Sequence, residues 1–373
     1  MNLELTDEQV ALRDTTRRFL TEKAPISGHV RPLLDDPTGT DASVWRGLAG
    51  LGITGLLVPE DHGGSGMTMV EAGIVAEELG AALHPGPWLS TAVAGPRALN
   101  LLGANDTAAK LLRGIADGTT IAAVSFLNLG NASAVTAGRR DDGMVLHGEV
   151  TGVPGAAAAD VLLAFADDAG DAGLFAVRNG SPGVSVAAEP GIDPTRKHFR
   201  VAFDAAPARR LGPASAQQIA AVIDDVLIAA AADALGAARA VMDLAIEYAK
   251  TRTQFGQPIG SFQAVQHLCV DMYETVELAR SGVIHALWAS DAFPSTDGQS
   301  GERHLAALRA KAFAGRLAAV ADTAIQVFGG IGYTWEHDAH LYLKRLLGWS
   351  AFLDAPDRYL TEIGAHLAKR GRH

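Results

Sequence analysis

The sequence predicts an α+β fold with a helical domain first, a β domain in the middle and a helical bundle last. Three observations lead to this prediction. Helix signals fill the first part of the chain, short β-type runs follow, and long alanine-rich segments make up the last part. A chain of 373 residues is also too long for one ordinary core, so we expect domains at residues 1–118, 119–213 and 214–373.

The first domain is expected to be helical. Thr6 followed by Gln9 is a capping-box pattern, which marks the start of a helix. Residues 59–66 contain Pro59 and three glycines, a density that opposes regular structure, so this stretch should be a loop. Helices are expected over residues 10–20, over 70–79 with Gly80 as the stop, and over 101–116.

The middle domain is expected to be an antiparallel β domain. Short β-type runs alternate there with clusters of Gly, Asp, Asn and Pro, and no helical segment separates them. This spacing favours an antiparallel barrel or sandwich over a parallel nucleotide-binding sheet. The expected strands are residues 121–126, 144–147, 161–165, 173–177 and 199–203.

The last domain is expected to be a four-helix bundle. Its segments are long and rich in alanine, which is the composition of closely packed bundle helices. The expected helices are residues 216–251, interrupted only by Gly236, then 263–288 and 302–327, with an interhelical loop at 293–301.

Composition narrows the class of protein and of partner. Hydrophobic residues make up 48% and charged residues 20%, as in a folded protein. A net charge of −11 without a basic stripe gives no reason to expect nucleic acid or a membrane surface as partner. Cys269 is the only cysteine, which excludes an intrachain disulfide and a cysteine-based zinc site. Without a leader or an apolar run of about 18 residues, we expect a soluble, cytoplasmic protein.

Several short motifs recur in a recognisable order. The last domain reads Arg-Thr-Gln-Phe-Gly at 252–256, Phe-Gln at 262–263 and Gln-Val-Phe-Gly-Gly-Ile-Gly-Tyr at 326–333. Earlier segments read Pro-Glu at 59–60, Gly-Gly-Ser-Gly at 63–66, Glu-Glu-Leu-Gly at 77–80 and Asp-Pro-Thr-Arg at 193–196. In this order and spacing they resemble the signatures of the acyl-CoA dehydrogenase family over nearly the whole chain.

The resemblance implies an FAD shared across a subunit interface. A guanidinium such as that of Arg252 suits a diphosphate because it offers planar, paired donors, although a solvated arginine at a helix end is the ordinary alternative. Glycines at 329 and 330 let the backbone approach a ligand, while phenylalanines at 255 and 262 could instead pack in a core. The implied FAD-binding residues are Arg252, Gln254, Phe255, Phe262, Gln263, Gln326, Gly329 and Gly330.

The family's catalytic base is missing at both of its usual positions. Family chemistry removes an α-proton from an acyl thioester with a glutamate, but the two positions read Leu353 and Val226 here. Neither side chain can accept a proton, so no residue of this chain is assigned as catalytic. Asp224, Asp225 and Asp354 lie close by in sequence, and Asp225 or Asp354 could serve as a displaced base.

The segment that cradles the flavin ring in the family is also altered. Residues 124–133 and 148–155 lack the family's Thr-Glu-Pro-x-x-Gly-Ser-Asp and Trp-Ile-Thr patterns. The resemblance is therefore to the base-lacking subunits of heterotetrameric acyl-CoA dehydrogenases from actinobacterial sterol degradation. It implies a partner subunit that carries the glutamate, an acyl-CoA substrate with a bulky group such as a steroid, and an electron-transfer acceptor.

Two other interpretations stay open at this point. The chain could be a self-sufficient homo-oligomeric dehydrogenase with an aspartate base, or a scaffold protein that kept the fold and has no redox activity. His337 and His340 lie three residues apart after the glycine-rich segment, but no third ligand accompanies them, so no metal is expected.

Overall fold

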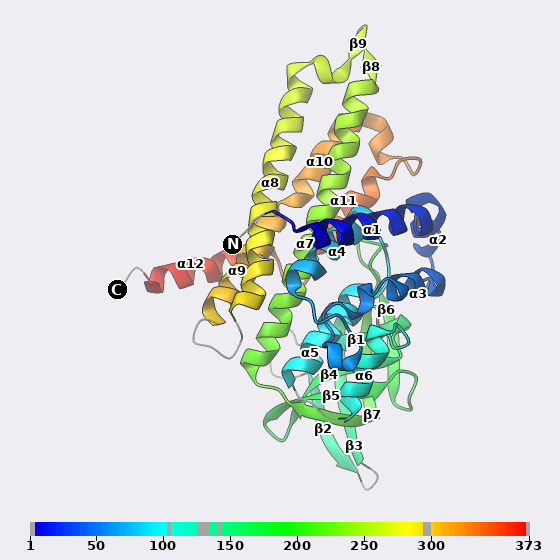
Figure 1. The fold of residues 1–373 in the computed structure, drawn as a ribbon, viewed down its shortest axis with the longest axis vertical. Helices are drawn as coiled ribbons and strands as arrows, with labels where there is room; N and C mark the ends of the chain where they lie inside the picture. The colour runs from blue at the N-terminus through cyan, green and yellow to red at the C-terminus, as the bar shows by residue number, and fades with distance from the viewer. Residues whose placement is uncertain (1–3, 103–105, 126–133, 141–142, 294–299, 371–373) are drawn as a thin grey trace.

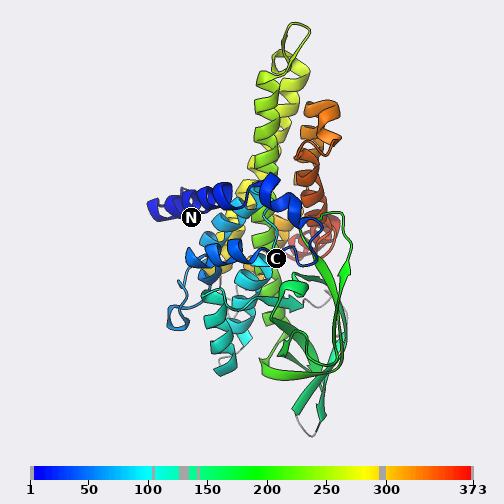
Figure 2. The same cartoon turned by 90° about the vertical axis from the view of Figure 1, so that its right-hand side faces the viewer.

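The computed structural model of the protein describes residues 4–102, 106–125, 134–140, 143–293 and 300–370. It has the predicted order of a helical domain, a β domain and a second helical domain (Figure 1). The β domain lies at one end of an elongated molecule, and a hairpin of two long helices projects at the other (Figures 1 and 2). The predicted fold class is thereby confirmed.

The N-terminal domain is built of short helices, and the capping box at its start is present. The Thr6 side chain accepts from the Gln9 backbone N–H, and the Gln9 side chain accepts from the Thr6 N–H. The α-helices are α1 (Asp7–Lys23), α2 (Arg31–Leu33), α3 (Ala42–Gly50), α4 (Met69–Ala81), α5 (Gly95–Leu102) and α6 (Asp106–Ala116). Between them lie π-helical turns at Ile26–Val30 and Leu89–Ala94 and 3₁₀ turns at Ile53–Gly55 and Glu60–His62.

Two details of this domain differ from the sequence prediction. Helix α4 continues through Gly80, which is buried inside it and does not stop it. A Cβ at Gly80 would lie 1.9 Å from the carbonyl oxygen of Asp233 on helix α7 (Ala216–Thr251), so the glycine is required for contact between the two helices and not for termination. The helix predicted over residues 101–116 is found as α6, preceded by α5, while residues 103–105 are outside the described part of the chain.

The β domain is a seven-stranded sheet that closes on itself. The strands are β1 (Ala122–Ser125), β2 (Val135–Arg140), β3 (Gly143–Pro154), β4 (Val161–Asp168), β5 (Asp171–Arg178), β6 (Val184–Glu189) and β7 (His198–Pro213). Strand β5 pairs with both β7 and β4, which joins the two ends of the order β4-β2-β3-β7-β5. Most neighbours are antiparallel as predicted, but β1 runs parallel to β4 from the Ala122–Val161 pair to the Ser125–Ala164 pair.

Strands β2 and β6 were not predicted from the sequence. Both carry mostly small or charged residues, so neither shows the apolar run that marks a buried strand. Within the described sheet, β6 is hydrogen-bonded only to β7. Phe126, the end of the first predicted strand, is outside the described residues.

The C-terminal domain contains the longest helices. They are α7 (Ala216–Thr251), α8 (Gln263–Ala292), α9 (Ser300–Ala314), α10 (Leu317–Phe328), α11 (Ala339–Ala351) and α12 (Pro356–Arg370). The bounds predicted for α7 are confirmed. The prediction of a single helix over residues 302–327 is wrong. The helix is interrupted between α9 and α10, where Pro356 of α12 packs against Gly315. Of the predicted loop at 293–301, residues 294–299 lie outside the described chain.

Helix α7 is the centre of the molecule and positions the candidate site. Every residue from Ala221 to Ala238 is buried, as expected for a helix packed on all sides. Its last turn emerges from the core and ends at Arg252. Among the described helices, none is long and apolar enough to cross a bilayer.

Candidate functional site

The Arg-Thr-Gln-Phe-Gly segment forms the tip of the projecting hairpin (Figure 1). Arg252 is the C-cap of α7, and two short strands follow it, β8 (Thr253–Gln254) and β9 (Gln257–Pro258). Phe255 and Gly256 join these strands with φ angles of 52° and 81°, the two positive φ values that a tight type I′ turn requires. The Phe255 and Phe262 rings meet edge to face with centroids 6.1 Å apart, which holds the turn against the start of α8.

The Gln-Val-Phe-Gly-Gly segment is held next to the end of α7. Tyr248 of α7 contacts Phe328, the last residue of α10, with ring centroids 5.2 Å apart. Gly329 then ends α10 with a φ of 65°, and a 3₁₀ turn spans Gly329–Tyr333. A Cβ placed at Gly329 or Gly330 would meet nothing within 4 Å, so the backbone there is open to a ligand.

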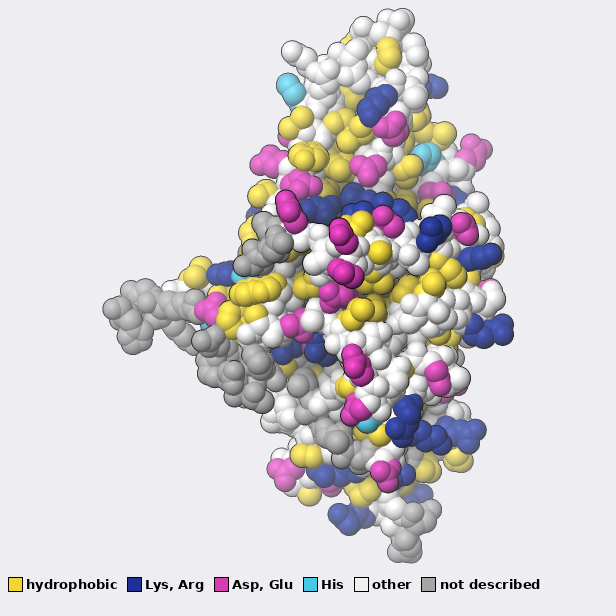
Figure 3. Space-filling view, in the orientation of Figure 1, with side chains coloured by type: hydrophobic (Ala, Val, Ile, Leu, Met, Phe, Trp, Pro, Cys, Tyr) yellow, Lys and Arg dark blue, Asp and Glu magenta, His cyan; other side chains and the backbone are white. Residues whose placement is uncertain are grey.

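The predicted FAD-binding side chains lie at one end of the molecule and face solvent. Arg252, Gln254, Gln263 and Gln326 are exposed, and Phe255 is 93% exposed. Further large apolar side chains are exposed on α8 and after α10, namely Val270, Tyr273, Tyr333 and Trp335. Figure 3 shows hydrophobic side chains gathered over the projecting helices. Such a surface is typical of one that a partner covers.

The position of the family base lies in a second region, where α11 meets the β domain. A cavity of about 520 Å³, here called the α11 cavity, is lined by Thr151, Gly152, Gly191, Ile192, Asp193, His198, Gly348, Ala351, Phe352, Leu353, Asp354 and Arg358. Leu353 has a φ of 54°, and its carbonyl oxygen accepts a hydrogen bond of 2.5 Å from Tyr359. The turn thus places a hydrocarbon side chain in the wall of the cavity, at the position where the resemblance implies a glutamate.

The other base position does not reach this cavity. The Val226 side chain is fully buried in the protein core, and it lies on α7 one turn before Ala230. The Asp225 Oδ1 lies 2.6 Å from Arg303 of α9 and accepts a hydrogen bond from Ser290 of α8, while its Oδ2 lies 3.2 Å from Arg97 of α5. Asp224 likewise contacts His304 at 2.9 Å, and burial raises the pKa of its carboxyl. Both aspartates therefore hold the bundle together, and neither lines the α11 cavity.

Two carboxylates do line the α11 cavity, and both are engaged. Asp354 accepts from Arg358 at 2.6 Å, and this hydrogen bond lowers the pKa of Asp354, which makes it a weaker base. Asp193 is buried and accepts from the backbone N–H and the hydroxyl of Thr195, at 2.9 and 2.6 Å. His198 also lines this cavity, and burial together with the nearby charge of Arg196 lowers its pKa.

A buried ion cluster fills the space between this cavity and α7. Arg345 donates to both oxygens of Asp233 at 2.9 Å and to Thr195 at 2.6 Å, and Arg196 donates to Asp233 as well. Burial works to raise the pKa of Asp233, but the two guanidinium charges outweigh it and hold that pKa below its ordinary value. The neighbouring inner cavity, which Asp233, Arg345 and Trp349 help to line, measures only about 40 Å³.

Thr195 and Arg196 belong to the 193–196 motif noted in the sequence, but Asp233, Arg345 and His198 were not singled out from it. A signal for Asp233 exists, since a lone acid in the alanine-rich run of α7 requires a buried cationic partner. No comparable signal marks Arg345 or His198, because their roles depend on contacts between distant segments. Of the altered ring-cradle segment, residues 126–133 lie outside the described chain, while Gly152 opens onto the α11 cavity.

Comparison with known proteins places the chain in one family. Residues 6–119 match the acyl-CoA dehydrogenase N-terminal domain and residues 223–351 match the acyl-CoA dehydrogenase C-terminal domain. The chain is 32% identical over 360 residues to acyl-CoA dehydrogenase IpdE2 of Mycobacterium tuberculosis, covering 96% of each protein.

Solved structures agree over the full length. The ChsE4-ChsE5 complex from Mycobacterium tuberculosis contains a chain with 27% identity and a TM-score of 0.88, covering 99% of both chains. A variant of the Tcur3481-Tcur3483 steroid ACAD gives 29% identity and a TM-score of 0.87, covering 98% of this chain and 99% of that chain. With the same motifs, the same domain order and both family domains matched, the chain belongs to the acyl-CoA dehydrogenase family.

Proposed function

We propose that this chain is the non-catalytic subunit of a heteromeric, FAD-dependent acyl-CoA dehydrogenase. In this proposal it supplies the half-site for the diphosphate and adenosine of an FAD whose ring lies in a partner chain. The partner carries the catalytic glutamate. The observation that carries the proposal is the combination of an open, solvent-facing half-site around Arg252 with Leu353 at the base position.

Each residue of the half-site has a separate task in this proposal. Arg252 pairs with the diphosphate, and the open backbone at Gly329 and Gly330 approaches it closely. Phe255 covers the adenosine, with Phe262 behind it. Gln254, Gln263 and Gln326 donate or accept hydrogen bonds along the cofactor. When bound, FAD accepts the hydride from the β-carbon of the acyl thioester, and the partner's glutamate takes the α-proton.

Relatives support a heteromer and a bulky substrate. Two of the similar solved structures are complexes named for two different chains, and one of these is called a steroid ACAD. We therefore propose a steroid-type or similarly bulky acyl-CoA as the substrate of the assembly, and an electron-transfer protein as the acceptor that reoxidises the flavin. The site of action is proposed to be the cytoplasm.

A self-sufficient enzyme with Asp354 as its base is the second candidate, because Asp354 lines the α11 cavity. Its hydrogen bond with Arg358 weakens it as a base, and its side chain is 41% exposed, which opposes the raised pKa that a general base needs. Asp354→Asn separates the two candidates. A loss of dehydrogenase activity in a partner-free preparation would favour Asp354, whereas unchanged activity of the co-purified complex favours the heteromer.

The decisive experiment counts flavins in the assembly. The chain is expressed alone and with a candidate partner, and the FAD released on denaturation is compared with chain numbers from native mass spectrometry. We expect fewer flavins than chains in the complex and almost none with this chain alone. If the chain alone purifies yellow, with near-stoichiometric FAD, and oxidises an acyl-CoA, the proposal is wrong.

A substitution at Arg252 tests the half-site itself. Arg252→Ala should weaken FAD binding by the complex by roughly tenfold or more, since a hydrogen bond to a charged group contributes about 1.5–3 kcal/mol. Arg252→Lys should recover part of the affinity, because charge is kept and paired geometry is lost. Arg200→Ala, on β7 of the β domain, is the matched control and should bind FAD normally.

A further inference from the structure

Helix α12 is attached to the rest of the protein by few buried side chains. Of its residues up to Ala368, Tyr359 alone is buried, and Leu360 and Leu367 are 45% and 51% exposed. In Figure 1 the helix extends away from the bundle toward the C-terminus. A segment with so little buried apolar surface can detach at small cost while the rest of the chain stays folded. The contacts that fasten α12 therefore decide whether it is docked.

His304 of α9 joins α12 to the centre of the bundle. Its Nδ1 lies 2.9 Å from Oδ1 of Asp224 on α7, and its Nε2 lies 3.1 Å from Oε1 of Glu362 on α12. The Asp224 side chain is buried, whereas those of His304 and Glu362 are 31% and 41% exposed. We call these three residues the His304 clasp. It connects three helices through one imidazole ring.

Each of the two hydrogen bonds in the clasp needs a proton. A neutral imidazole has one N–H and an ionised carboxylate has none, so the second bond requires either an imidazolium or a protonated Asp224. The hydrogen bond with Asp224 outweighs burial and raises the pKa of His304 to about 9, and burial raises the pKa of Asp224. Both directions keep the second proton in the clasp at neutral pH. Its removal would leave a ring lone pair facing a carboxylate oxygen.

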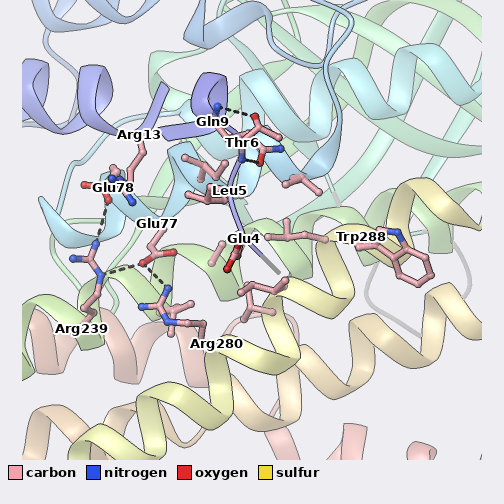
Figure 4. Close-up of a pocket in the computed structure, with 18 of the residues that line it drawn as sticks. Glu4, Leu5, Thr6, Gln9, Arg13, Glu77, Glu78, Arg239, Arg280 and Trp288 are labelled. Atoms are coloured by element: carbon pink, nitrogen blue, oxygen red, sulfur yellow. Dashed lines mark hydrogen bonds and ion pairs between the residues drawn. The ribbon is translucent and has the colours of Figure 1, made fainter. Parts of the chain in front are cut away.

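The junction of α4, α7 and α8 shows a fastening of a different kind. There Arg239 and Arg280 both donate to Glu77, at 3.0 and 3.4 Å (Figure 4). A guanidinium keeps its charge throughout the pH range in which proteins are studied. An imidazole does not, so the fastening of α12 depends on pH whereas that of α4 to α7 and α8 does not.

The charged groups beside the clasp are occupied by other partners. Arg303, the neighbour of His304 on α9, lies 2.6 Å from Asp225 of α7. On α12, Arg358 donates to Asp354, and the His366 ring lies 6.3 Å from the ring of His304.

Two further charges lie on the helices that pack beside the clasp. Asp291 of α8 pairs with Arg97 of α5 at 2.8 Å. Lys311 of α9 donates to the carbonyl oxygens of Trp349 and Phe352, and burial lowers its pKa to about 7. Since Lys311 also changes charge above neutral pH, its effect has to be separated from that of His304 by mutation.

Helix α12 also supports one wall of the α11 cavity. Its Tyr359 hydroxyl donates to the carbonyl oxygen of Leu353 at 2.5 Å. Its Arg358 lines the cavity and pairs there with Asp354. If α12 detached, both side chains would leave this wall, and the cavity would open on that side.

We propose that α12 is a strap that closes the α11 cavity and that the His304 clasp fastens it. The clasp contributes fully below about pH 6.5, the ordinary pKa of histidine, and its contribution is lost as the pH rises through about 9. The inference is independent of the proposed FAD half-site, because no clasp residue belongs to the predicted FAD-binding set.

A distance measurement in the co-purified complex tests whether the strap detaches. Nitroxide labels are placed at Leu51→Cys and Leu367→Cys in a Cys269→Ser chain, diluted with unlabelled chain, and their separation is measured by pulsed electron paramagnetic resonance. A docked strap gives one narrow distance distribution and a detached strap a broad one. We expect the ratio of detached to docked strap to rise at least about tenfold between about pH 7 and pH 10.

Variants of the clasp assign this change to His304. Glu362→Gln removes one charge at a half-exposed position, so the chain should fold, and at pH 7 it should raise the detached fraction by about tenfold. His304→Gln should detach the strap at pH 7 and remove the transition near pH 9. His366→Gln, on the same helix, is the matched control and should behave like the wild type.

The link to the cavity is tested with a thiol in its wall. In a Cys269→Ser chain, Leu353→Cys should react with a thiol reagent at least about threefold faster at pH 7 when Glu362→Gln is added. Adding His366→Gln instead should leave the rate unchanged.

Three results would overturn the proposal. The first is a wild-type strap that stays docked up to about pH 10. The second is an unchanged pH transition in Glu362→Gln and His304→Gln, which would assign the transition to Lys311. The third is an unchanged reaction rate at Leu353→Cys while the strap is detached. The first result needs no change in the clasp, so it decides the matter even if His304→Gln fails to fold.

Discussion

At the scale of single residues, the charges buried along α7 decide much of the local structure. Asp233 is 5% exposed and fully enclosed by Arg345, Arg196 and the chain around them. A buried carboxylate is tolerated only when cations and hydrogen bonds replace its water. The cluster lies beside the α11 cavity, and Asp233, Arg196 and Arg345 also line the small inner cavity next to it.

Asp233→Ala should be strongly destabilising because it leaves the guanidinium of Arg345 buried with fewer partners. We expect a loss of about 3–5 kcal/mol in the free energy of unfolding, measured by urea denaturation. Asp233→Ala combined with Arg345→Met removes both charges and should recover part of the loss.

The exposed pair of Arg200 with Glu149 provides the comparison for this experiment. Their atoms are 3.6 Å apart and both side chains are about half exposed. Glu149→Ala should change the free energy of unfolding by less than about 1 kcal/mol, because exposed ion pairs are screened. An Asp233→Ala loss as small as that of Glu149→Ala would contradict the importance given to the buried cluster.

At the scale of elements, the crossing of α4 and α7 depends on two glycines. A Cβ at Gly236 would lie 1.8 Å from the carbonyl oxygen of Glu77, and Gly80 faces Asp233 in the same way. The two backbones therefore touch, which brings Glu77 and Glu78 beside Arg239. From the sequence alone, Gly80 is interpreted as a helix stop and Gly236 as an interruption of a long helix.

Gly236→Ala should destabilise the protein although alanine is the better helix former. The intrinsic gain is about 1 kcal/mol, while forcing the helices apart should cost more than about 2 kcal/mol. Gly282→Ala on α8 is the matched control, since a Cβ there meets nothing within 4 Å. It should be neutral or stabilising by up to about 1 kcal/mol in thermal unfolding. Equal effects of the two substitutions would mean that the α4–α7 crossing accommodates a Cβ at Gly236 without cost.

At the scale of the whole molecule, the tip of the hairpin formed by α7 and α8 projects away from the rest of the chain (Figure 1). Its tip is exposed on all described sides, and α8 presents Val270 and Tyr273, 60% and 57% exposed, along its length. The chain gains no stability from exposing such apolar side chains to water. Their exposure supports the proposal that a partner subunit covers this surface.

Tyr273→Asp should prevent assembly with the partner without unfolding the chain. A carboxylate placed in an apolar contact loses its water and finds no cation, so association should weaken by at least tenfold in light-scattering or co-purification measurements. Leu51→Asp, at a 41% exposed leucine after α3, is the control and should assemble normally. An assembled Tyr273→Asp complex with full flavin content would exclude this face of α8 from the interface.

The sequence by itself determined the domain order, the bounds of α7 and the start of α8, because helix periodicity and capping are local properties. It also determined that Leu353 and Val226 cannot act as bases, which follows from side-chain chemistry alone. Only the tertiary structure decided where Asp225, Asp233 and Gly80 are directed, and which groups meet across the cavities. Their partners, such as Arg303 and Arg345, lie far away in the chain, and no local pattern encodes a contact made by packing distant elements together.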